Sequence, residues 1–254
     1  MCVDGIIWSY YVEGSEGKAV LFIHGMGGSY DIWWQQLQYL ERTHRVIAFT
    51  LPVEVSTLAE VERGVQALLD RERVDQLVVV GTSMGGYIAQ YLMTKMPQRL
   101  RGVVLGHTFP PNAYVRKRHQ LLAVLLRLLP AVVIRYYGWY VYRTKVFPAA
   151  GRSAIVRCFL LSKPFSKRSF LHRYRILIEP FALDPERYRS IPKCIFESDN
   201  DPLVPAVLRD ALKATYPEAS VYTFHGVGHF PYLNAADAYN TALRKCLEGV
   251  FDWV

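Results

Sequence analysis

Short hydrophobic runs rich in Val, Ile and Leu alternate along the chain with segments of helical spacing. Such runs are typical of strands that are buried on both faces of a parallel sheet, and they occupy residues 18–25, 44–52, 75–83, 100–108, 193–201 and 220–229. Helical patterns fill residues 30–42, 56–73, 85–96, 205–216 and 235–250. The alternation predicts an α/β fold with a doubly wound, mostly parallel sheet, and IIWSYYVEG near the start adds a strand at an edge.

Residues 109–191 interrupt this alternation. Their patterns are mostly helical and they lie between two predicted strands. We therefore expect a helical cap at 109–191, inserted into a core domain made of residues 1–108 and 192–254. Leu121–Ile134 is too short to span a bilayer and contains Arg127 and Pro130, so a buried or cap helix is favoured over a membrane span.

The net charge of +8 is concentrated in the cap. Residues 112–189 contain sixteen Lys and Arg and three acids, which is +13 and leaves −5 for the rest of the chain. Such a segment can attract an anionic ligand or a membrane surface, and a plain solvated face explains it equally well. No nucleic-acid partner is expected, because no recognised module accompanies the charge. The sequence does not indicate an oligomeric state.

The cysteines are widely spread, at Cys2, Cys158, Cys194 and Cys246, and none forms a CxxC motif. The N-terminus lacks the basic region of a signal peptide and carries Asp4 early. These features predict four free thiols in a reducing, cytoplasmic compartment and no metal site.

The stretch VVVGTSMGG places Ser83 where a predicted strand becomes a predicted helix. In a nucleophile elbow a serine occupies such a strained turn, and glycines two positions before and after it make room. Gly81 and Gly85 occupy these positions. The start of the helix adds backbone N–H groups and positive potential, which favour an oxyanion. Ser83 is therefore the predicted nucleophile, and a simple glycine turn is the alternative.

A serine nucleophile needs a base, and the base needs an acid that orients it. His229 follows a predicted strand between Gly228 and Phe-Pro, in the chain order expected for the base of this fold. We expect His225 to be a structural or surface residue. Asp201 is the favoured acid, Asp199 is the alternative, and Glu197 within the strand pattern is a third choice.

The loop HGMGGS after the first predicted parallel strand supplies the other half of the expected site. Gly25 and Gly27 let the backbone approach a ligand closely. The backbone N–H groups of Met26 and Met84 would then form an oxyanion hole. Turn formation alone is the competing explanation for these glycines.

Together, HGMGGS, GTSMGG, DNDPLVP and GVGHFPYLN resemble the oxyanion, elbow, acid and histidine loops of the α/β-hydrolase superfamily, in order and at usual spacing. The resemblance covers essentially the whole chain except the cap. The segments RVIAFTLPVEVSTLAEVERGVQALLD and YPEASVYTFHGVGHFPYLNAADAYN look like the maspardin-type branch. That resemblance allows a non-catalytic binding protein with an eroded triad, although this chain retains a serine, an acid and a histidine.

The predicted chemistry is cleavage of an ester or related acyl substrate without a metal or organic cofactor. His229 takes the proton of Ser83, Met26 and Met84 hold the oxyanion, and Asp201 orients the imidazole. A serine at the elbow argues against the branches that need an aspartate there, such as dehalogenases and epoxide hydrolases. A carbon–carbon bond hydrolase or a lyase on the same triad remains an alternative, because a triad sets the mechanism and not the substrate. An apolar acyl or aromatic group would suit the Leu-, Tyr- and Phe-rich cap.

Overall fold

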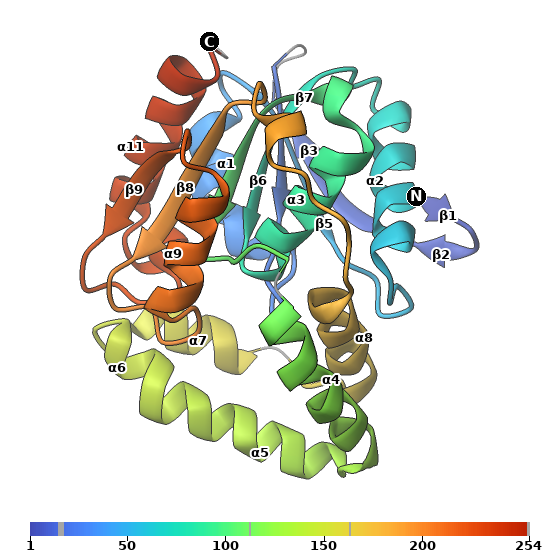
Figure 1. Cartoon of the computed structure of the whole chain (residues 1–254), viewed down its shortest axis with the longest axis vertical. Coiled ribbons are helices and arrows are strands. Elements are labelled where there is room, and N and C mark those ends of the chain that lie inside the picture. The colour runs from blue at the N-terminus through green and yellow to red at the C-terminus, as the bar shows by residue number, and fades with distance from the viewer. Residues whose placement is uncertain (15–17, 112, 163, 253–254) are drawn as a thin grey trace.

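The computed structural model describes residues 1–14, 18–111, 113–162 and 164–252. A seven-stranded sheet forms the centre of the molecule, in the order β3-β5-β4-β6-β7-β8-β9 (Figure 1). Its strands are β3 (Ser9–Glu13), β4 (Ala19–Ile23), β5 (Arg45–Thr50), β6 (Leu77–Thr82), β7 (Leu100–Gly106), β8 (Lys193–Ser198) and β9 (Ser220–Phe224). Only β3 is antiparallel to its neighbour. The predicted α/β class and the mostly parallel sheet are confirmed.

The N-terminal segment differs from the single edge strand expected there. Ser9–Glu13 does form the edge strand β3, paired with β5. The residues before it turn back on themselves, so that β1 (Cys2–Val3) pairs with β2 (Ile6–Ile7) in a separate antiparallel hairpin. Asp4 and Gly5 have positive φ angles of 50° and 78° and form the turn of this hairpin, and Trp8 separates β2 from β3.

Helices cover both faces of the sheet because alternate side chains of its strands point to opposite sides. On one face, residues such as Leu21 and Val79 pack with α2 (Leu58–Arg71), α3 (Met84–Lys95) and α9 (Ala206–Thr215). On the other face, Phe22 and Val80 pack with α1 (Trp34–Leu40) and α11 (Ala236–Lys245). The short helix α10 (Pro231–Asn234) precedes α11, and a π-helical turn at Cys246–Val250 follows it. Two hydrophobic layers therefore enclose the strands.

Helices α4 to α8, which we call the cap, follow β7 and precede β8. They are α4 (Ala113–Leu128), α5 (Ala131–Val141), α6 (Phe147–Ala149), α7 (Ala154–Ser162) and α8 (Lys167–Ile178). They lie across the end of the sheet toward which the parallel strands run (Figure 1). Among the described residues, no helix combines the length and the apolar character needed to cross a bilayer.

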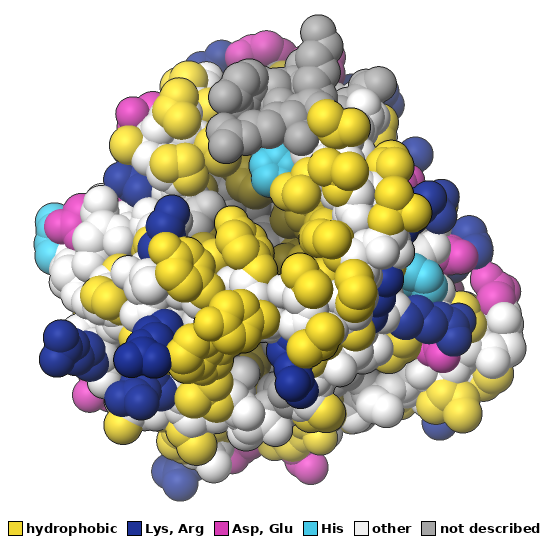
Figure 2. Space-filling view, turned by 90° about the horizontal axis from the view of Figure 1, so that it is seen from below, with side chains coloured by type: hydrophobic (Ala, Val, Ile, Leu, Met, Phe, Trp, Pro, Cys, Tyr) yellow, Lys and Arg dark blue, Asp and Glu magenta, His cyan; other side chains and the backbone are white. Residues whose placement is uncertain are grey.

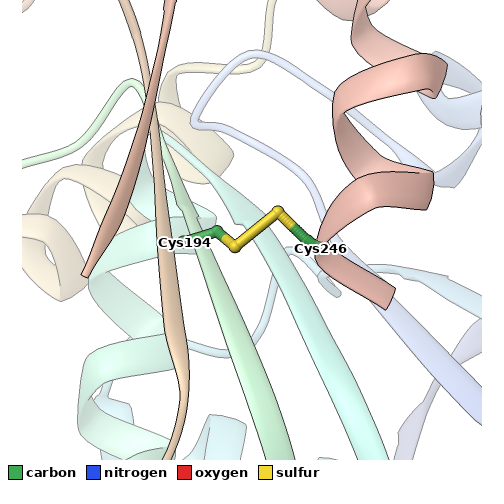
Figure 3. Close-up of a disulfide and its surroundings, with 2 residues drawn as sticks. All are labelled: Cys194 and Cys246. Atoms are coloured by element: carbon green, nitrogen blue, oxygen red, sulfur yellow. A yellow bond between two sulfur atoms is a disulfide. The ribbon is translucent and has the colours of Figure 1, made fainter. Parts of the chain in front are cut away.

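Two cysteines correct the expectation of four free thiols. Cys194 on β8 and Cys246 at the end of α11 form a disulfide, with Cα atoms 6.6 Å apart and a sequence separation of 52 (Figure 3). Their wide spacing gave no local sign of the pair, because packing of the C-terminal helix on the sheet brings them together. Cys2 and Cys158 are free and exposed.

Candidate active site

Ser83 occupies a strained turn between β6 and α3. Its backbone has φ 56° and ψ −118°, a conformation that residues other than glycine adopt rarely. The turn is held from three sides: the Ser83 N–H donates to the carbonyl of Gly106 (2.8 Å), and the Ser83 carbonyl accepts from the Thr108 hydroxyl (2.8 Å) and the Tyr87 N–H (3.1 Å). Neighbouring loops therefore maintain the strain and present the Ser83 side chain at the carboxyl end of β6.

The glycines on either side of Ser83 lie so close to neighbouring backbone that a Cβ atom would clash there. A Cβ on Gly81 would lie 2.2 Å from the carbonyl oxygen of Gly85, and one on Gly85 would lie 2.1 Å from that of Ile23. Both obstacles are backbone atoms, so neither can move aside by a rotamer change. These two glycines let α3 begin directly against β4 and β6.

The loop after β4 packs on Ser83. A Cβ on Gly25 would lie 3.3 Å from Cβ of Ser83. His24 Nε2 accepts a hydrogen bond from the Leu51 N–H (2.9 Å), so its Nδ1 carries the proton and donates to the carbonyl of Gly25 (2.7 Å). The Gly28 N–H donates to the same carbonyl (3.0 Å). Because the peptide is planar and trans, the Met26 N–H points away from this carbonyl.

The cap also contacts this loop directly. The buried Arg173 of α8 donates to the carbonyl oxygens of Met26 (2.8 Å), Gly28 (2.9 Å) and Leu51 (3.1 Å). Burial lowers the pKa of Arg173 to about 10. A Cβ on Gly27 would lie 3.5 Å from the hydroxyl of Tyr142, which follows α5. The loop that carries Met26 is therefore enclosed between the sheet and the cap.

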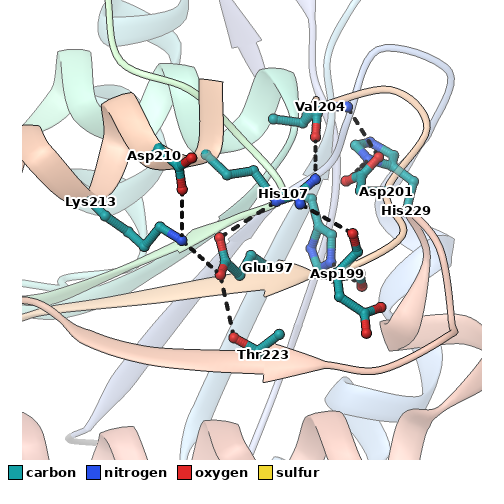
Figure 4. A network of polar contacts seen from close by, with 11 residues as sticks. His107, Glu197, Asp199, Asp201, Val204, Asp210, Lys213, Thr223 and His229 are labelled. Atoms are coloured by element: carbon teal, nitrogen blue, oxygen red, sulfur yellow. Dashed lines mark hydrogen bonds and ion pairs between the residues drawn. The ribbon is translucent and has the colours of Figure 1, made fainter. Parts of the chain in front are cut away.

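His229 and Asp201 form a buried pair at the ends of the last two strands. Nδ1 of His229 lies 2.7 Å from Oδ2 of Asp201, and the two side chains are 3% and 0% exposed (Figure 4). Burial alone would raise the pKa of Asp201, but the charge of His229, its hydrogen bond and the N–H of Leu203 lower that pKa to about 2. The N–H groups of Leu203 and Val204 donate to Oδ1. Asp201 is thus an ionised acceptor, which places a proton on Nδ1 of His229 and leaves Nε2 as the acceptor nitrogen of the neutral ring.

Asp199 and Glu197, the two other candidate acids predicted from the sequence, have different partners. Asp199 accepts from Nδ1 of the exposed His225 (2.9 Å) and from the Gly226 N–H (2.9 Å). Glu197 is buried on β8 itself, where its carboxylate accepts from Lys213 of α9 (3.1 Å) and from Thr223 of β9 (3.3 Å). Neither carboxylate reaches His229 by a hydrogen bond that the described residues contain.

His107 is part of this site, although the sequence pattern did not predict a role for it. It follows β7 with a positive φ of 47°, and its ring packs edge-on against that of His229, with centroids 5.6 Å apart. Its Nε2 lies 3.0 Å from the Ser198 hydroxyl. Burial is the main cause that lowers the pKa of His107 to about 3, so the ring stays neutral. The pattern GHT at a strand end, beside the elbow, was the available signal.

Gly106 and His107 connect the Ser83 turn to the His229–Asp201 pair. The Gly106 carbonyl holds the Ser83 N–H, and the adjacent His107 ring contacts His229. Across the described part of the chain, no direct hydrogen bond joins the Ser83 hydroxyl to His229. Catalytic hydrogen bonds in ligand-free enzymes are often long or poorly aligned and tighten when substrate binds. The structure thus places the predicted serine, histidine and aspartate at the carboxyl ends of the parallel strands, after β6, β9 and β8.

Comparison with known proteins agrees with this architecture. Mouse maspardin (Mus musculus) is 23% identical over 235 residues, which cover 91% of this chain and 75% of maspardin. The dihydrolipoyllysine-residue acetyltransferase component of the acetoin cleaving system of Cupriavidus necator is 37% identical over 111 residues, but this match covers only 41% of the chain and 30% of that protein. The structure of a thermophilic esterase from Thermogutta terrifontis superposes with a TM-score of 0.78 at 20% identity, over 97% of this chain and 94% of the esterase.

The family assignment depends on a match to a family model and not on any one relative. A model of the alpha/beta hydrolase family matches residues 20–242. This range includes the Ser83 turn, the loop after β4 and the buried His229–Asp201 pair. The chain therefore belongs to the alpha/beta hydrolase family.

Proposed function

We propose that this hydrolase-family protein is a serine hydrolase that cleaves carboxylic esters or related acyl substrates through an acyl-enzyme intermediate. The observation that carries the proposal is the buried His229–Asp201 pair, in which Nδ1 and Oδ2 lie 2.7 Å apart. This pair lies at the carboxyl ends of the parallel strands, as the strained Ser83 turn does. A histidine with a fixed tautomer and a serine on a strand-to-helix turn are the two parts that acyl transfer requires.

The proposed reaction has two steps. The Ser83 hydroxyl attacks the substrate carbonyl as His229 Nε2 takes its proton, and the oxyanion accepts hydrogen bonds from the N–H groups of Met26 and Met84. The tetrahedral intermediate collapses and His229 returns the proton to the leaving alcohol. Water then attacks the acyl-enzyme, with His229 again acting as base and Ser83 as leaving group. Asp201 remains ionised throughout and holds the imidazole in position.

A fluorophosphonate probe and a panel of short p-nitrophenyl esters, lactones and diketones test this proposal. We expect the wild type to be labelled and to turn over at least one ester, and Ser83→Ala to lose both properties. Asp201→Asn should lower kcat by about 10⁴-fold, because an amide can hold the wrong tautomer of His229. The matched control is Asp199→Asn, which changes an exposed carboxylate two positions away and should retain kcat within a few-fold.

Two results would contradict the proposal. A folded wild type that is neither labelled nor active would favour a non-catalytic binding protein on the same fold. Cleavage of diketones without esters would assign the same triad to carbon–carbon bonds.

A further inference from the structure

Helix α5 is more hydrophobic than its position in the fold explains. Its sequence is AVVIRYYGWYV, in which a single residue carries a charge. A helix that is apolar on all sides is normally buried on all sides. Here Ile134 alone is buried, and Gly138 and Val141 are half-buried on the same stripe. The remaining side chains face outward, including Tyr136, which is 70% exposed.

The exposed surface of α5 continues onto α4. Five apolar side chains of α4 and that of Leu129 just after it are exposed, the most exposed being Leu128 at 78%: Leu121, Leu122, Val124, Leu125, Leu128 and Leu129. Figure 2 shows hydrophobic side chains gathered on this face of the molecule, with Lys and Arg around them. An open hollow of about 460 Å³ lies on α5 between five apolar and aromatic side chains: Val132, Val133, Tyr136, Tyr137 and Tyr140. Contiguous apolar patches of this kind mark interaction surfaces.

The charge around this surface has one sign. No Asp or Glu occurs in the sequence between Asp75 and Glu179. Exposed basic residues flank the apolar side chains on the cap helices and on the π-helical segment Tyr142–Val146 between α5 and α6, namely Arg127, Arg135, Arg143, Lys145, Arg157 and Arg168. A partner that covers this face must therefore offer an apolar layer bordered by negative charge.

We propose that the cap binds the surface of a bilayer that contains anionic phospholipids, with α5 lying in the plane of the interface. Tyrosine and tryptophan rings are favoured at the boundary between headgroups and acyl chains, and Arg and Lys reach anionic headgroups. An α5 of eleven residues extends only about 16 Å, so it can lie on a bilayer and cannot cross one.

A second copy of the chain fits this surface less well than lipid. A two-fold contact would place the same face on both sides, since such interfaces use one patch of each subunit. Arg127 and Arg135 would then face a surface that carries the same basic residues, with no described carboxylate on the cap helices to compensate them. An anionic bilayer supplies that compensation.

Sedimentation of the 254-residue protein with lipid vesicles tests the proposal. Vesicles of phosphatidylcholine and phosphatidylglycerol at equal amounts should bind the wild type, and pure phosphatidylcholine vesicles should bind it at least about tenfold more weakly. Raising the salt from 50 to 500 mM should weaken binding to the anionic vesicles, because exposed charges are screened. Ser83→Ala should bind as the wild type does, so that failure of the hydrolase proposal leaves this one intact.

Paired variants separate the apolar and the charged contributions. Tyr136→Ser with Tyr137→Ser should weaken binding by about tenfold or more, whereas Ile7→Ser, which alters a residue 75% exposed on the distant β1–β2 hairpin, should not. Arg127→Glu with Arg135→Glu should weaken it by at least about 30-fold. The matched control is Arg42→Glu with Arg244→Glu, which reverses two exposed charges outside the cap.

Four outcomes would overturn the proposal. Wild type that remains in the supernatant with anionic vesicles rules out the bilayer as partner. Equal binding to neutral vesicles rules out recognition of anionic lipid. Equal loss in the control variants rules out the cap as the contact. Light scattering that shows a stable dimer, which the tyrosine substitutions dissociate, assigns the surface to a second copy.

Discussion

Asp199 and Asp201 lie two positions apart and carry the same side chain, but their surroundings give them different partners. Asp201 is buried and pairs with His229, whereas Asp199 is exposed and pairs with His225. The difference arises from the turn after β8, in which the N–H groups of Leu203 and Val204 hold the Asp201 carboxylate in place. The sequence favoured Asp201, but only the turn geometry shows which histidine each aspartate meets.

His107 should make the stability of the protein depend on pH. In the unfolded chain its pKa is about 6.5, and burial lowers the pKa to about 3 in the folded protein. Between these values the unfolded state binds a proton that the folded state does not, so stability falls as pH decreases through this window. About 2 kcal/mol of the unfolding free energy should be lost at pH 5. Urea unfolding at pH 7, 6 and 5 measures the loss, and His107→Gln should remove this component.

The comparison variant for this experiment is His225→Gln. His225 is exposed at the end of β9, with a side-chain exposure of 78%, so its replacement should leave the slope between pH 7 and 5 almost unchanged. An unchanged slope in His107→Gln would show that His107 is not the group responsible. The lowered pKa of Asp201 acts below about pH 3.8, outside the range measured.

At the scale of elements, β6, the Ser83 turn and α3 form a unit that depends on close backbone contact. Gly85 lies in the first turn of α3, where the helix touches the end of β4. The contact brings the N-terminus of α3 and the loop after β4 together beside Ser83. Short-range chemistry could predict this unit, because glycines and a serine at fixed spacing leave few alternatives.

Two glycine-to-alanine changes in helices should have opposite effects. In Gly85→Ala the new Cβ would lie 2.1 Å from the carbonyl oxygen of Ile23, so α3 must shift from β4, and we expect destabilisation by about 3 kcal/mol or more. In Gly138→Ala, within α5, the new Cβ meets no atom within 4 Å, and we expect stabilisation by about 0.5–1 kcal/mol. Thermal unfolding of both variants measures the difference. Equal shifts would contradict the close contact of α3 with β4.

At the scale of the whole molecule, the Cys194–Cys246 disulfide joins the central sheet to the C-terminal helix. Both cysteines are fully buried in the hydrophobic layer that α1 and α11 form with the sheet. A crosslink between distant positions lowers the conformational entropy of the unfolded chain, and this effect grows with the length of the closed loop. The pair therefore stabilises a packing that the two segments cannot specify locally.

Reduction of this disulfide should lower the unfolding free energy by about 4 kcal/mol, given the separation of 52 residues. Guanidinium unfolding with and without dithiothreitol measures the change. Thiol titration is the control: two thiols, from Cys2 and Cys158, should react in the oxidised unfolded protein and four after reduction. Four reactive thiols before reduction would show that the bond is absent.

The sequence by itself determined the alternation of strands and helices, the family and the Ser83 turn. These features depend on residues close together in the chain, such as Gly81, Ser83 and Gly85, or on apolar spacing within one element. The tertiary structure decided the pairing of Asp201 with His229, the contact of His107 with that pair, the Cys194–Cys246 bond and the exposure of α5. Each of these depends on segments that are distant in sequence, and no local pattern encodes which of them will meet.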